Sequence, residues 1–441
     1  MENKQIIDIN LKKAIKESAP SRYYETVQKI LLDIKNSKVK NSNYLGVFNV
    51  FKNVKKSDYE KIQEISSELL SNGIEYLVII ATQTIINQIK ALADLHFDLR
   101  KENESIKLVY VNENFNSLEV AKLLIKLQNK KFAINVISQT GECLETLIMF
   151  RELKNLLYKE LGKAGASKYI YVTTNNNYGR LFNDAKINQY THLTILDNTV
   201  ERFLSYSPAI LLPIACIGIN IEKYLSGAHK ANEFFLNAPL EKNSAVLYAI
   251  TRKILHDNNF IFENVCYFEQ NQESLAKLWQ MLFSETISSM NNRIYIETCL
   301  GGVDNKTLAS NYTNTPFKCF DTCLKFQEPI MDCKISQNNE NETDGLNYLS
   351  NLTYNNLCNL VMETFIENHV NVYKIPNIQI MIDNYNDSTL GWIMSFLHHS
   401  SILFAYLNEQ NPFERKPLES YNFNLAKNFK ELLGGKKKWL K

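Results

Sequence analysis

Short strand-like runs alternate with longer helical segments along the first half of this chain. The runs "YLVII", "KLVYV", "FAINVIS", "YIYVTT" and "HLTIL" are rich in β-branched and aromatic residues. A segment long enough for a crossover helix separates each run from the next, which favours parallel strands over hairpins. This alternation predicts an α/β fold with a parallel, doubly wound sheet.

A second set of runs follows in the other half of the chain: "NVCYF", "RIYIETCL", "CLKFQ" and "IQIMI". Between them, "LAKLWQMLF" predicts a helix whose apolar residues repeat at helical spacing on one face, namely Leu275, Leu278, Trp279, Leu282 and Phe283. The polar stretch "KISQNNENETDG" predicts an exposed loop. Because 441 residues are enough for two hydrophobic cores, we expect two α/β units.

The charge balance argues against a nucleic-acid partner, since the formal net charge is only +2. The basic end "GGKKKWLK" is either a solvated tail or a contact for an acidic protein. The first residues, "MENKQIIDINLKKAIKES", lack the apolar run of a signal peptide. The longest apolar stretch, "AILLPIACIGI", contains Pro213 and is too short for a membrane span, so it predicts a buried helix. We therefore expect a cytoplasmic protein with no membrane span.

Eight cysteines are scattered along the chain without a CxxC pair. In a chain of this length they are expected to be reduced thiols rather than a disulfide framework. Cys319, Cys323 and Cys333 lie close in sequence, but their spacing fits no standard zinc site and no nearby histidine completes one. We expect no metal and no cofactor.

The segment "SQTGECLET", residues 138–146, has the form of a phosphate-binding loop between the strand "KFAINVI" and the helix "LETLIMFRELKNLL". Its Glu142 opposes that function. A carboxylate ~4 Å from one phosphate charge would repel it by about 4 kcal/mol at an effective dielectric constant near 20, nearly a thousandfold in affinity. Glu142 is expected instead to cap the helix that follows.

The end of the chain carries the most specific motif. "NPFERKPLESYNFNLAKNFKELLGG" predicts a helix with Pro417 in its first turn and Gly434 at its end. It resembles the C-terminal signature of the glucose-6-phosphate isomerase family. Other segments resemble that family in the same order, among them "NSNYLG", "NVISQTGECLET", "RFLSYSPAILLPIACIGINIEKYLSGAHKA", "LWQMLFSE" and "DGLNYL". The resemblance implies two sugar-isomerase (SIS) α-β-α domains with a C-terminal helical arm, normally in a dimer.

The resemblance and the alternation together give four expected parts. They are an N-terminal helical segment (1–70) that packs on the second domain, a first SIS-like domain (71–205), a second SIS-like domain (206–410), and a C-terminal helix with its basic tail (411–441).

Carried over residue by residue, the family's phosphate site is only partly present. Ser138, Thr140 and Gly141 match it, and Thr84 takes the place of the serine in the family's first glycine-rich turn. The lysine and the two threonines of the phosphate loop are replaced by Gln139, Glu142 and Cys143. The glycines of the first turn are replaced along Ile80–Thr84, and the two glycines before the family's arginine are Val200 and Glu201. Each loss of glycine adds a Cβ where the backbone should approach the substrate.

Some of the family's catalytic residues are matched in this sequence and others are replaced. The resemblance places the family's proton-transfer base at Glu285 and its arginine at Arg202. The ring-opening histidine aligns with Gly301, and the lysine of the C-terminal helix aligns with Asn422. Lys427 lies about 140° around the helix from that position and is a poor substitute. Losing one acid–base group typically costs about 10²- to 10⁴-fold in rate.

None of the seven histidines lies at the family's histidine position. His398 and His399, in "FLHHSS", are expected at a helix surface or at the edge of the core.

Three functions remain open. The first is a homologue that has lost catalysis and serves as a structural subunit of a larger cytoplasmic complex, as a homodimer or in a hetero-assembly. The alternative is an active glucose-6-phosphate isomerase with altered motifs, for which sugar phosphate would be the ligand. A sensor of another ligand in the old cleft is a third reading, without a motif of its own. The altered phosphate loop favours the first.

Overall fold

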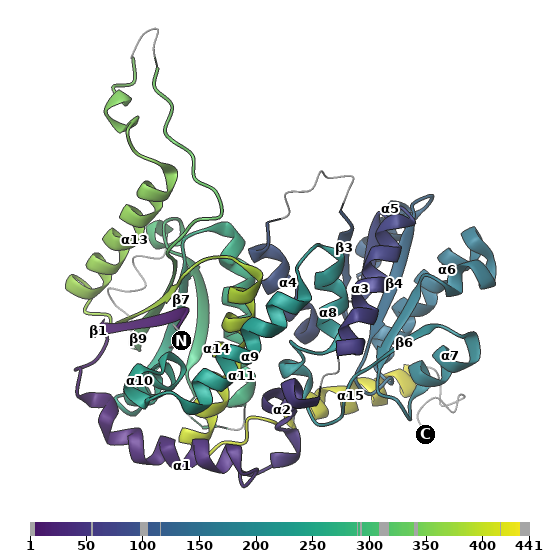
Figure 1. Cartoon of the computed structure of the whole chain (residues 1–441), viewed down its shortest axis with the longest axis horizontal. Coiled ribbons are helices and arrows are strands. Elements are labelled where there is room, and N and C mark those ends of the chain that lie inside the picture. The colour runs from purple at the N-terminus through teal and green to yellow at the C-terminus, as the bar shows by residue number, and fades with distance from the viewer. Residues whose placement is uncertain are drawn as a thin grey trace.

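The computed structural model describes the backbone of residues 5–53, 56–97, 105–114, 116–288, 290–291, 293–307, 317–338, 343–414 and 416–432. Two five-stranded sheets organise the chain and lie side by side (Figure 1). Predicted α/β units are therefore present in both halves. The basic tail from residue 433 onward lies outside the described residues.

The first sheet has the strand order β3-β2-β4-β5-β6 and is parallel throughout. Its strands are β2 (Tyr76–Ile80), β3 (Lys107–Val111), β4 (Phe132–Ile137), β5 (Ile170–Thr174) and β6 (Thr191–Thr194). These are the five strands that the sequence predicts. Their carboxyl ends meet at one edge, where ligands bind in open α/β sheets.

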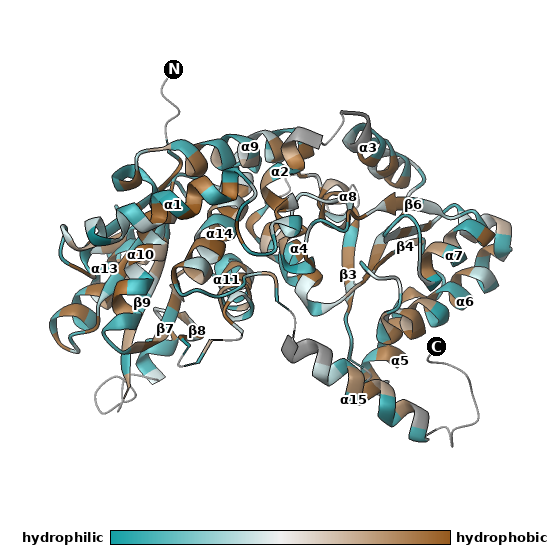
Figure 2. Ribbon diagram, turned by 90° about the horizontal axis from the view of Figure 1, so that it is seen from below, coloured by the Kyte–Doolittle hydropathy of each residue, from teal (hydrophilic) through white to brown (hydrophobic). Residues whose placement is uncertain are grey.

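Helices cover both faces of this sheet because its side chains alternate between two apolar cores. Val78 and Ile80 face one core, and Leu77 and Ile79 face the other. On the first face lie α5 (Ser117–Leu127), α6 (Leu144–Ser167) and α7 (Arg180–Asn188), and on the second lie α3 (Lys56–Ser71), α4 (Gln83–Leu95) and α8 (Pro208–Cys216). The hydropathy colouring shows brown strands between helices with teal outer faces (Figure 2).

The second sheet has the order β1-β10-β9-β7-β8. Its parallel strands are β7 (Phe260–Tyr267), β8 (Tyr295–Leu300), β9 (Lys318–Phe326) and β10 (Asn377–Ile382). The fifth strand, β1 (Ile7–Lys13), pairs with β10 in the antiparallel direction. The N-terminal segment, expected to be helical, therefore begins with an edge strand. The buried Ile7 explains this, since its side chain extends the core beneath the sheet.

Five long helices surround the second sheet. One face carries α10 (Ser244–Asp257), α11 (Glu273–Thr286) and α14 (Asp387–Leu407), with α9 (Ile221–Asn237) packed on α14, and the other face carries α13 (Tyr354–Asn371). Glycines let α9 and α14 approach closely: a Cβ on Gly227 would lie 2.0 Å from the Ser388 carbonyl oxygen, and one on Gly391 would lie 2.1 Å from that of Tyr224. The apolar stripe predicted on α11 is buried.

By length and composition α14 could cross a membrane, yet 94% of its most apolar window is buried by the rest of the protein, as in the core helix of a globular fold. His398 and His399 are only 1% and 6% exposed. The expectation of a helix surface or core edge for these two residues was wrong, because α14 is enclosed on all sides rather than along one stripe.

The remaining elements are short or peripheral. They are α1 (Tyr24–Lys35), α2 (Gly46–Asn53), α15 (Lys416–Leu432) and the 3₁₀ turns η1 (Ala19–Tyr23), η2 (Ser42–Tyr44), η4 (Glu201–Phe203), η5 (Leu240–Lys242), η6 (Gln270–Gln272) and η7 (Asn347–Leu349). The predicted C-terminal helical arm is α15, which runs beneath the first unit (Figure 1). Helix α4 of the first unit packs against α11 of the second. The domain boundaries themselves remain a prediction.

Candidate active site

Arg202 and Glu285, which are 83 residues apart in sequence, form an ion pair with 2.8 Å between Nε and Oε2. Arg202 lies on η4, and Glu285 lies in the last turn of α11. The arginine side chain is 6% exposed and the carboxylate 35%. The structure thus brings together the two catalytic candidates that survive in the sequence.

Two further hydrogen bonds join the Arg202 guanidinium to the backbone. Its Nη1 donates to the Pro412 carbonyl oxygen at 2.7 Å, and its Nη2 donates to that of Glu414 at 3.0 Å. The chain that follows α14 therefore closes over the arginine. These contacts and the bond to Glu285 use three of the five N–H groups of the guanidinium.

A fully buried glutamine, Gln88, fixes the backbone on both sides of this pair. Its Nε2 donates to the carbonyl oxygens of Thr84 (3.1 Å) and Glu201 (3.0 Å). The Thr84 hydroxyl in turn donates to Oε1 of Glu285 at 3.3 Å. Sequence reasoning missed Gln88, because a polar residue on a buried helix face carries no motif.

The same network reaches a core histidine. The Ser205 hydroxyl donates to Oε1 of Gln88 at 2.9 Å and lies 3.1 Å from Nε2 of His398. Since the serine proton is used for Gln88, the serine accepts from His398, whose proton must therefore be on Nε2. Burial lowers the pKa of His398 to about 3, so the imidazole is neutral.

The loop at residues 138–143 turns its polar groups onto itself. The Ser138 hydroxyl accepts from the Gly141 N–H at 3.2 Å, and the Thr140 hydroxyl accepts from the Glu142 N–H at 3.3 Å. Gln139 donates through Nε2 to the Thr199 carbonyl oxygen at 2.6 Å. The hydroxyl and N–H groups that would surround a phosphate are thereby partly satisfied within the protein.

The turn after β5 covers this loop. Asn175 donates through Nδ2 to the Gln139 carbonyl oxygen at 3.2 Å. Gly179 has φ of +90°, and a Cβ there would lie 2.5 Å from the Thr140 carbonyl oxygen. Only glycine allows this close approach.

Glu142 caps a helix, although not the expected one. Its Oε1 accepts from the backbone N–H of Arg180, the first residue of α7, at 2.8 Å, and its Oε2 lies 3.1 Å from Nε of the same arginine. The N-cap of α6 is Cys143, which makes no side-chain capping bond. The backbone turns at Gly141 (φ +68°), and the side chain of Glu142 therefore points toward α7 instead of α6. Sequence spacing gave no sign that Arg180 would meet this loop.

Comparison with known proteins shows the family of this chain. The family model described as phosphoglucose isomerase matches residues 93–298. Glucose-6-phosphate isomerase of Mycoplasmopsis pulmonis is 33% identical over 421 residues, covering 96% of this chain and 98% of the relative. The chain belongs to the phosphoglucose isomerase family. The resemblance stated from the sequence is confirmed.

Solved structures show the same fold at lower identity. A hypothetical protein, TT0462 from Thermus thermophilus, superposes with a TM-score of 0.83 at 21% identity, covering 96% of this chain and 99% of that one. A glucose-6-phosphate isomerase from Chlamydia trachomatis superposes with a TM-score of 0.75 at 13% identity, covering 97% of this chain and 89% of that one. The predicted pair of SIS-type α/β units with a helical C-terminal arm is therefore confirmed.

Gly301, which the sequence resemblance assigns to the family's histidine position, lies against an aromatic ring. Gly301 follows β8, and its N–H donates to the Tyr267 carbonyl oxygen at 2.9 Å. A Cβ at Gly301 would lie 2.4 Å from Cε1 of Phe268. Phe268 in turn packs edge-on against Phe365, with 5.5 Å between ring centroids. A histidine has no room here unless Phe268 moves.

Asn422, which the sequence resemblance assigns to the family's C-terminal lysine position, lies in solvent. Asn422 is exposed on α15, and among the described residues no hydrogen bond joins it to Glu285 or Arg202. Lys427 lies 3.9 Å from Glu431 on the same exposed face. Neither residue supplies a cation to the Arg202–Glu285 pair.

All eight cysteines are free thiols. Burial raises the pKa of Cys143, at the start of α6, to about 11, so its thiol is protonated near neutral pH. Within the described ranges, no cluster of three or more His, Cys, Asp or Glu side chains could hold a metal ion.

Proposed function

We propose that this member of the phosphoglucose isomerase family has lost catalysis and serves as a structural subunit of a larger protein assembly. The proposal depends mainly on the surroundings of Gly301. The Phe268 ring occupies the space that the family's ring-opening histidine would need at this position. Without an acid–base group there, the closed ring of a hexose phosphate has no catalyst for opening.

Carboxylates of the protein itself support the same proposal. Glu142 occupies the N-terminus of α7 beside the phosphate loop, and Glu201 accepts from the Thr82 hydroxyl in the altered first turn. A helix N-terminus attracts anions. At α7 that attraction is used by Glu142, so a sugar phosphate in the adjoining loop would meet a negative charge, although the N-terminus of α6 carries no side-chain cap.

The alternative is a working glucose-6-phosphate isomerase, as the relatives are named. The Arg202–Glu285 pair favours it, since a carboxylate base beside an arginine and the Thr84 hydroxyl is what proton transfer between neighbouring carbons requires. This pair is also stable as an internal ion pair, and its presence is therefore compatible with both functions.

A coupled assay distinguishes the two. The purified full chain is mixed with fructose 6-phosphate, and glucose 6-phosphate is detected by an NADP-dependent dehydrogenase, with the Mycoplasmopsis pulmonis relative as positive control. We expect no turnover above background and no calorimetric binding of either sugar phosphate below millimolar concentration. Turnover of about 1 s⁻¹ or more, the usual enzymatic range, would establish the alternative.

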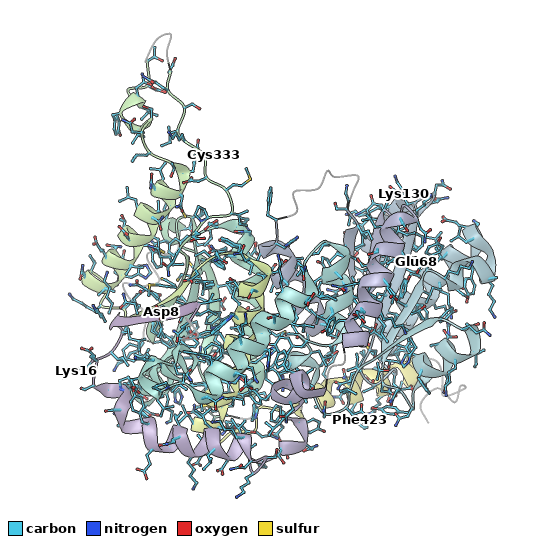
Figure 3. The ribbon with its side chains drawn as sticks, in the orientation of Figure 1. Asp8, Lys16, Glu68, Lys130, Cys333 and Phe423 are labelled. Carbon is cyan, nitrogen blue, oxygen red and sulfur yellow. The ribbon has the colours of Figure 1, made fainter. Side chains whose placement is uncertain are left out.

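The assembly role is supported by what the chain preserves. Its cores are intact, while α15 presents large apolar side chains to solvent, with Tyr421 63% and Phe423 71% exposed (Figure 3). We place the protein in the cytoplasm, as a homodimer or bound to different subunits. Affinity purification from the native cell at low ionic strength should recover stoichiometric partners. Recovery of a free homodimer with isomerase activity would contradict the proposal.

A further inference from the structure

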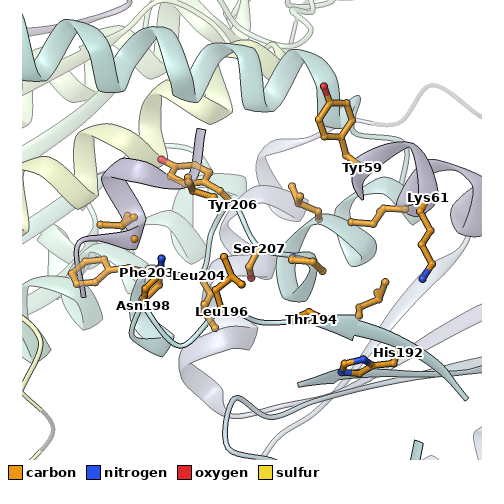
Figure 4. A pocket seen from close by; sticks show the side chains of 18 residues that line it. Tyr59, Lys61, His192, Thr194, Leu196, Asn198, Phe203, Leu204, Tyr206 and Ser207 are labelled. Carbon is orange, nitrogen blue, oxygen red and sulfur yellow. The ribbon is translucent and has the colours of Figure 1, made fainter. Parts of the chain in front are cut away.

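A cavity of about 330 Å³ lies between α2, α3, β6 and the start of α8 (Figure 4). Its size is at the lower end of the roughly 300–1,000 Å³ that small-molecule sites occupy. The walls are mainly apolar, with Val47, Val50, Leu204 and Leu211 among the lining residues. Arg202 and Glu285 do not line it, so this cavity is separate from the candidate active site.

Ser207 gives the cavity an unused polar group. Its hydroxyl oxygen is buried and has no hydrogen-bond partner. Ser207 is also the N-cap residue of α8, where a serine normally bonds a backbone N–H of the first turn, but it makes no such bond. A buried polar atom left without a partner costs about 1–3 kcal/mol, so a ligand that supplied one would recover part of that free energy.

The rim of the cavity carries a cation. Lys61 and Tyr59, both from α3, lie on one side of the cavity, with His192 and Thr194 of β6 on the other (Figure 4). Among the residues that the structure describes, no carboxylate pairs with Lys61. The cavity thus combines mainly apolar walls, the unpaired buried hydroxyl group of Ser207 and one positive charge at its rim.

We propose that this cavity binds a small organic acid with an aromatic or branched apolar body. A hydroxyl or carbonyl group of the ligand pairs with Ser207, and its carboxylate pairs with Lys61. The site is independent of the substrate cleft of the family, although the two adjoin: on η4, Arg202 contacts Glu285 while its neighbour Phe203 lines the cavity.

Three small molecules test separately the contributions of the apolar body, the hydroxyl group and the carboxylate to binding. 4-Hydroxybenzoate carries all three features, benzoate lacks the hydroxyl group, and 4-cresol lacks the carboxylate. For a ligand of about 10 non-hydrogen atoms at ~0.3–0.5 kcal/mol each, we expect 4-hydroxybenzoate to bind the full chain with a dissociation constant of about 0.2–10 mM by titration calorimetry. A crystal structure with the probe should place it against Ser207. Fructose 6-phosphate at 10 mM should not compete.

Matched variants test each contact. Ser207→Ala should weaken 4-hydroxybenzoate about three- to tenfold and leave benzoate unchanged. Because Ser207 makes no capping bond, this variant should still fold. Lys61→Gln should weaken both acids and leave 4-cresol unchanged, with Lys159→Gln, an exposed lysine on α6, as its control.

A variant that fills the cavity provides the decisive binding experiment. Leu196 is 51% exposed and lines the cavity, so Leu196→Trp should abolish binding of all three probes while the protein stays folded. Leu118→Trp, at a similarly exposed position on α5, should not affect it. The proposal is overturned if no probe binds saturably below 20 mM, if Leu196→Trp leaves the affinity unchanged, if sugar phosphate competes, or if the cavity holds only ordered water at that concentration.

Discussion

The Thr82 hydroxyl donates to a carboxylate oxygen of Glu201 at 2.6 Å, across 119 residues of sequence. The sequence resemblance assigns both residues to glycine positions of the phosphoglucose isomerase family, Thr82 to the first glycine-rich turn and Glu201 to the position just before the arginine. Two departures from the family pattern therefore contact each other directly. Their bond joins the N-cap residue of α4 to the residue that precedes Arg202 on η4.

This contact should be measurable as a coupling free energy. In a double-mutant cycle of Thr82→Val and Glu201→Gln, we expect about 1–2 kcal/mol of coupling in urea unfolding, because a half-buried hydrogen bond to a charged group exceeds a neutral one. The exposed pair Glu119 and Lys122, 2.9 Å apart on α5, serves as control and should couple by less than about 0.5 kcal/mol. Equal coupling in the two cycles would show that Thr82 and Glu201 are merely adjacent.

Gly301→His should fail to restore activity and should destabilise the protein. The added Cβ would meet the Phe268 ring at 2.4 Å, and relieving such an overlap costs about 1–3 kcal/mol. The measurement is the urea midpoint together with the coupled isomerase assay.

The clash itself is tested by smaller changes. Gly301→Ala should destabilise the wild type more than it destabilises Phe268→Leu, in which the ring is absent. Gly302→Ala is the matched control, since its Cβ would be 3.0 Å from a Val361 methyl group that can shift. If Gly301→His were as stable as the wild type and turned over fructose 6-phosphate, the proposed loss of function would be wrong.

Most helices and strands could be predicted from the sequence, because their spacing of apolar residues is a local pattern. Alternating apolar runs predicted all four strands of the second parallel set, and the stripe on α11 predicted its buried face. Strand β1 was missed although "IDINLKK" alternates apolar and polar residues as a half-buried strand does, because the whole N-terminal segment was expected to be helical. Its antiparallel pairing with β10, near the other end of the chain, has no local signal in the sequence.

Residues of the candidate site could be predicted from the sequence only where a family motif identified them. Glu285 and Arg202 were found through the resemblance, and the structure joins them. Gln88, Arg180 and Phe268 were missed because their roles depend on which loops meet in space. Gly301 shows the difference most clearly: the sequence indicates a missing histidine, whereas only the structure shows that a ring has taken its place.

Glu142→Gln should raise the affinity for inorganic phosphate. Glutamine can still accept from the Arg180 N–H, but the negative charge beside the loop is removed. Because Glu142 and Arg180 are 45% and 43% exposed and partly neutralise each other, we expect about a tenfold gain rather than a thousandfold one. Titration calorimetry checks this, with Glu152→Gln, an exposed residue of α6, as control. An unchanged or lower affinity would mean that Glu142 is not what excludes the anion.

The two core histidines should make the protein sensitive to mild acid. Burial lowers the pKa of His398 and of His399 from 6.5 to about 3. The unfolded chain therefore binds protons that the folded chain does not, and the free energy of unfolding should fall as pH drops from about 6.5 toward 3. In that window each histidine changes the free energy of unfolding by about 1.4 kcal/mol per pH unit. Above pH 6.5 both imidazoles are neutral in the folded and the unfolded chain, so no stability is lost there.

Replacing the histidines should flatten this dependence. Urea unfolding followed by tryptophan fluorescence reports on the relevant core, since Trp279 and Trp392 are both buried in the second unit. Between pH 6 and 4.5, His398→Gln should reduce the slope of unfolding free energy against pH by about 1.4 kcal/mol per unit, and the double change with His399→Gln by about twice that. Ser205→Ala removes the hydroxyl that contacts His398 but leaves both imidazoles in place, so it should lower stability at every pH without changing the slope. A wild-type slope in the double variant would show that acid destabilises the protein through other groups, and that these imidazoles gain no protons on unfolding.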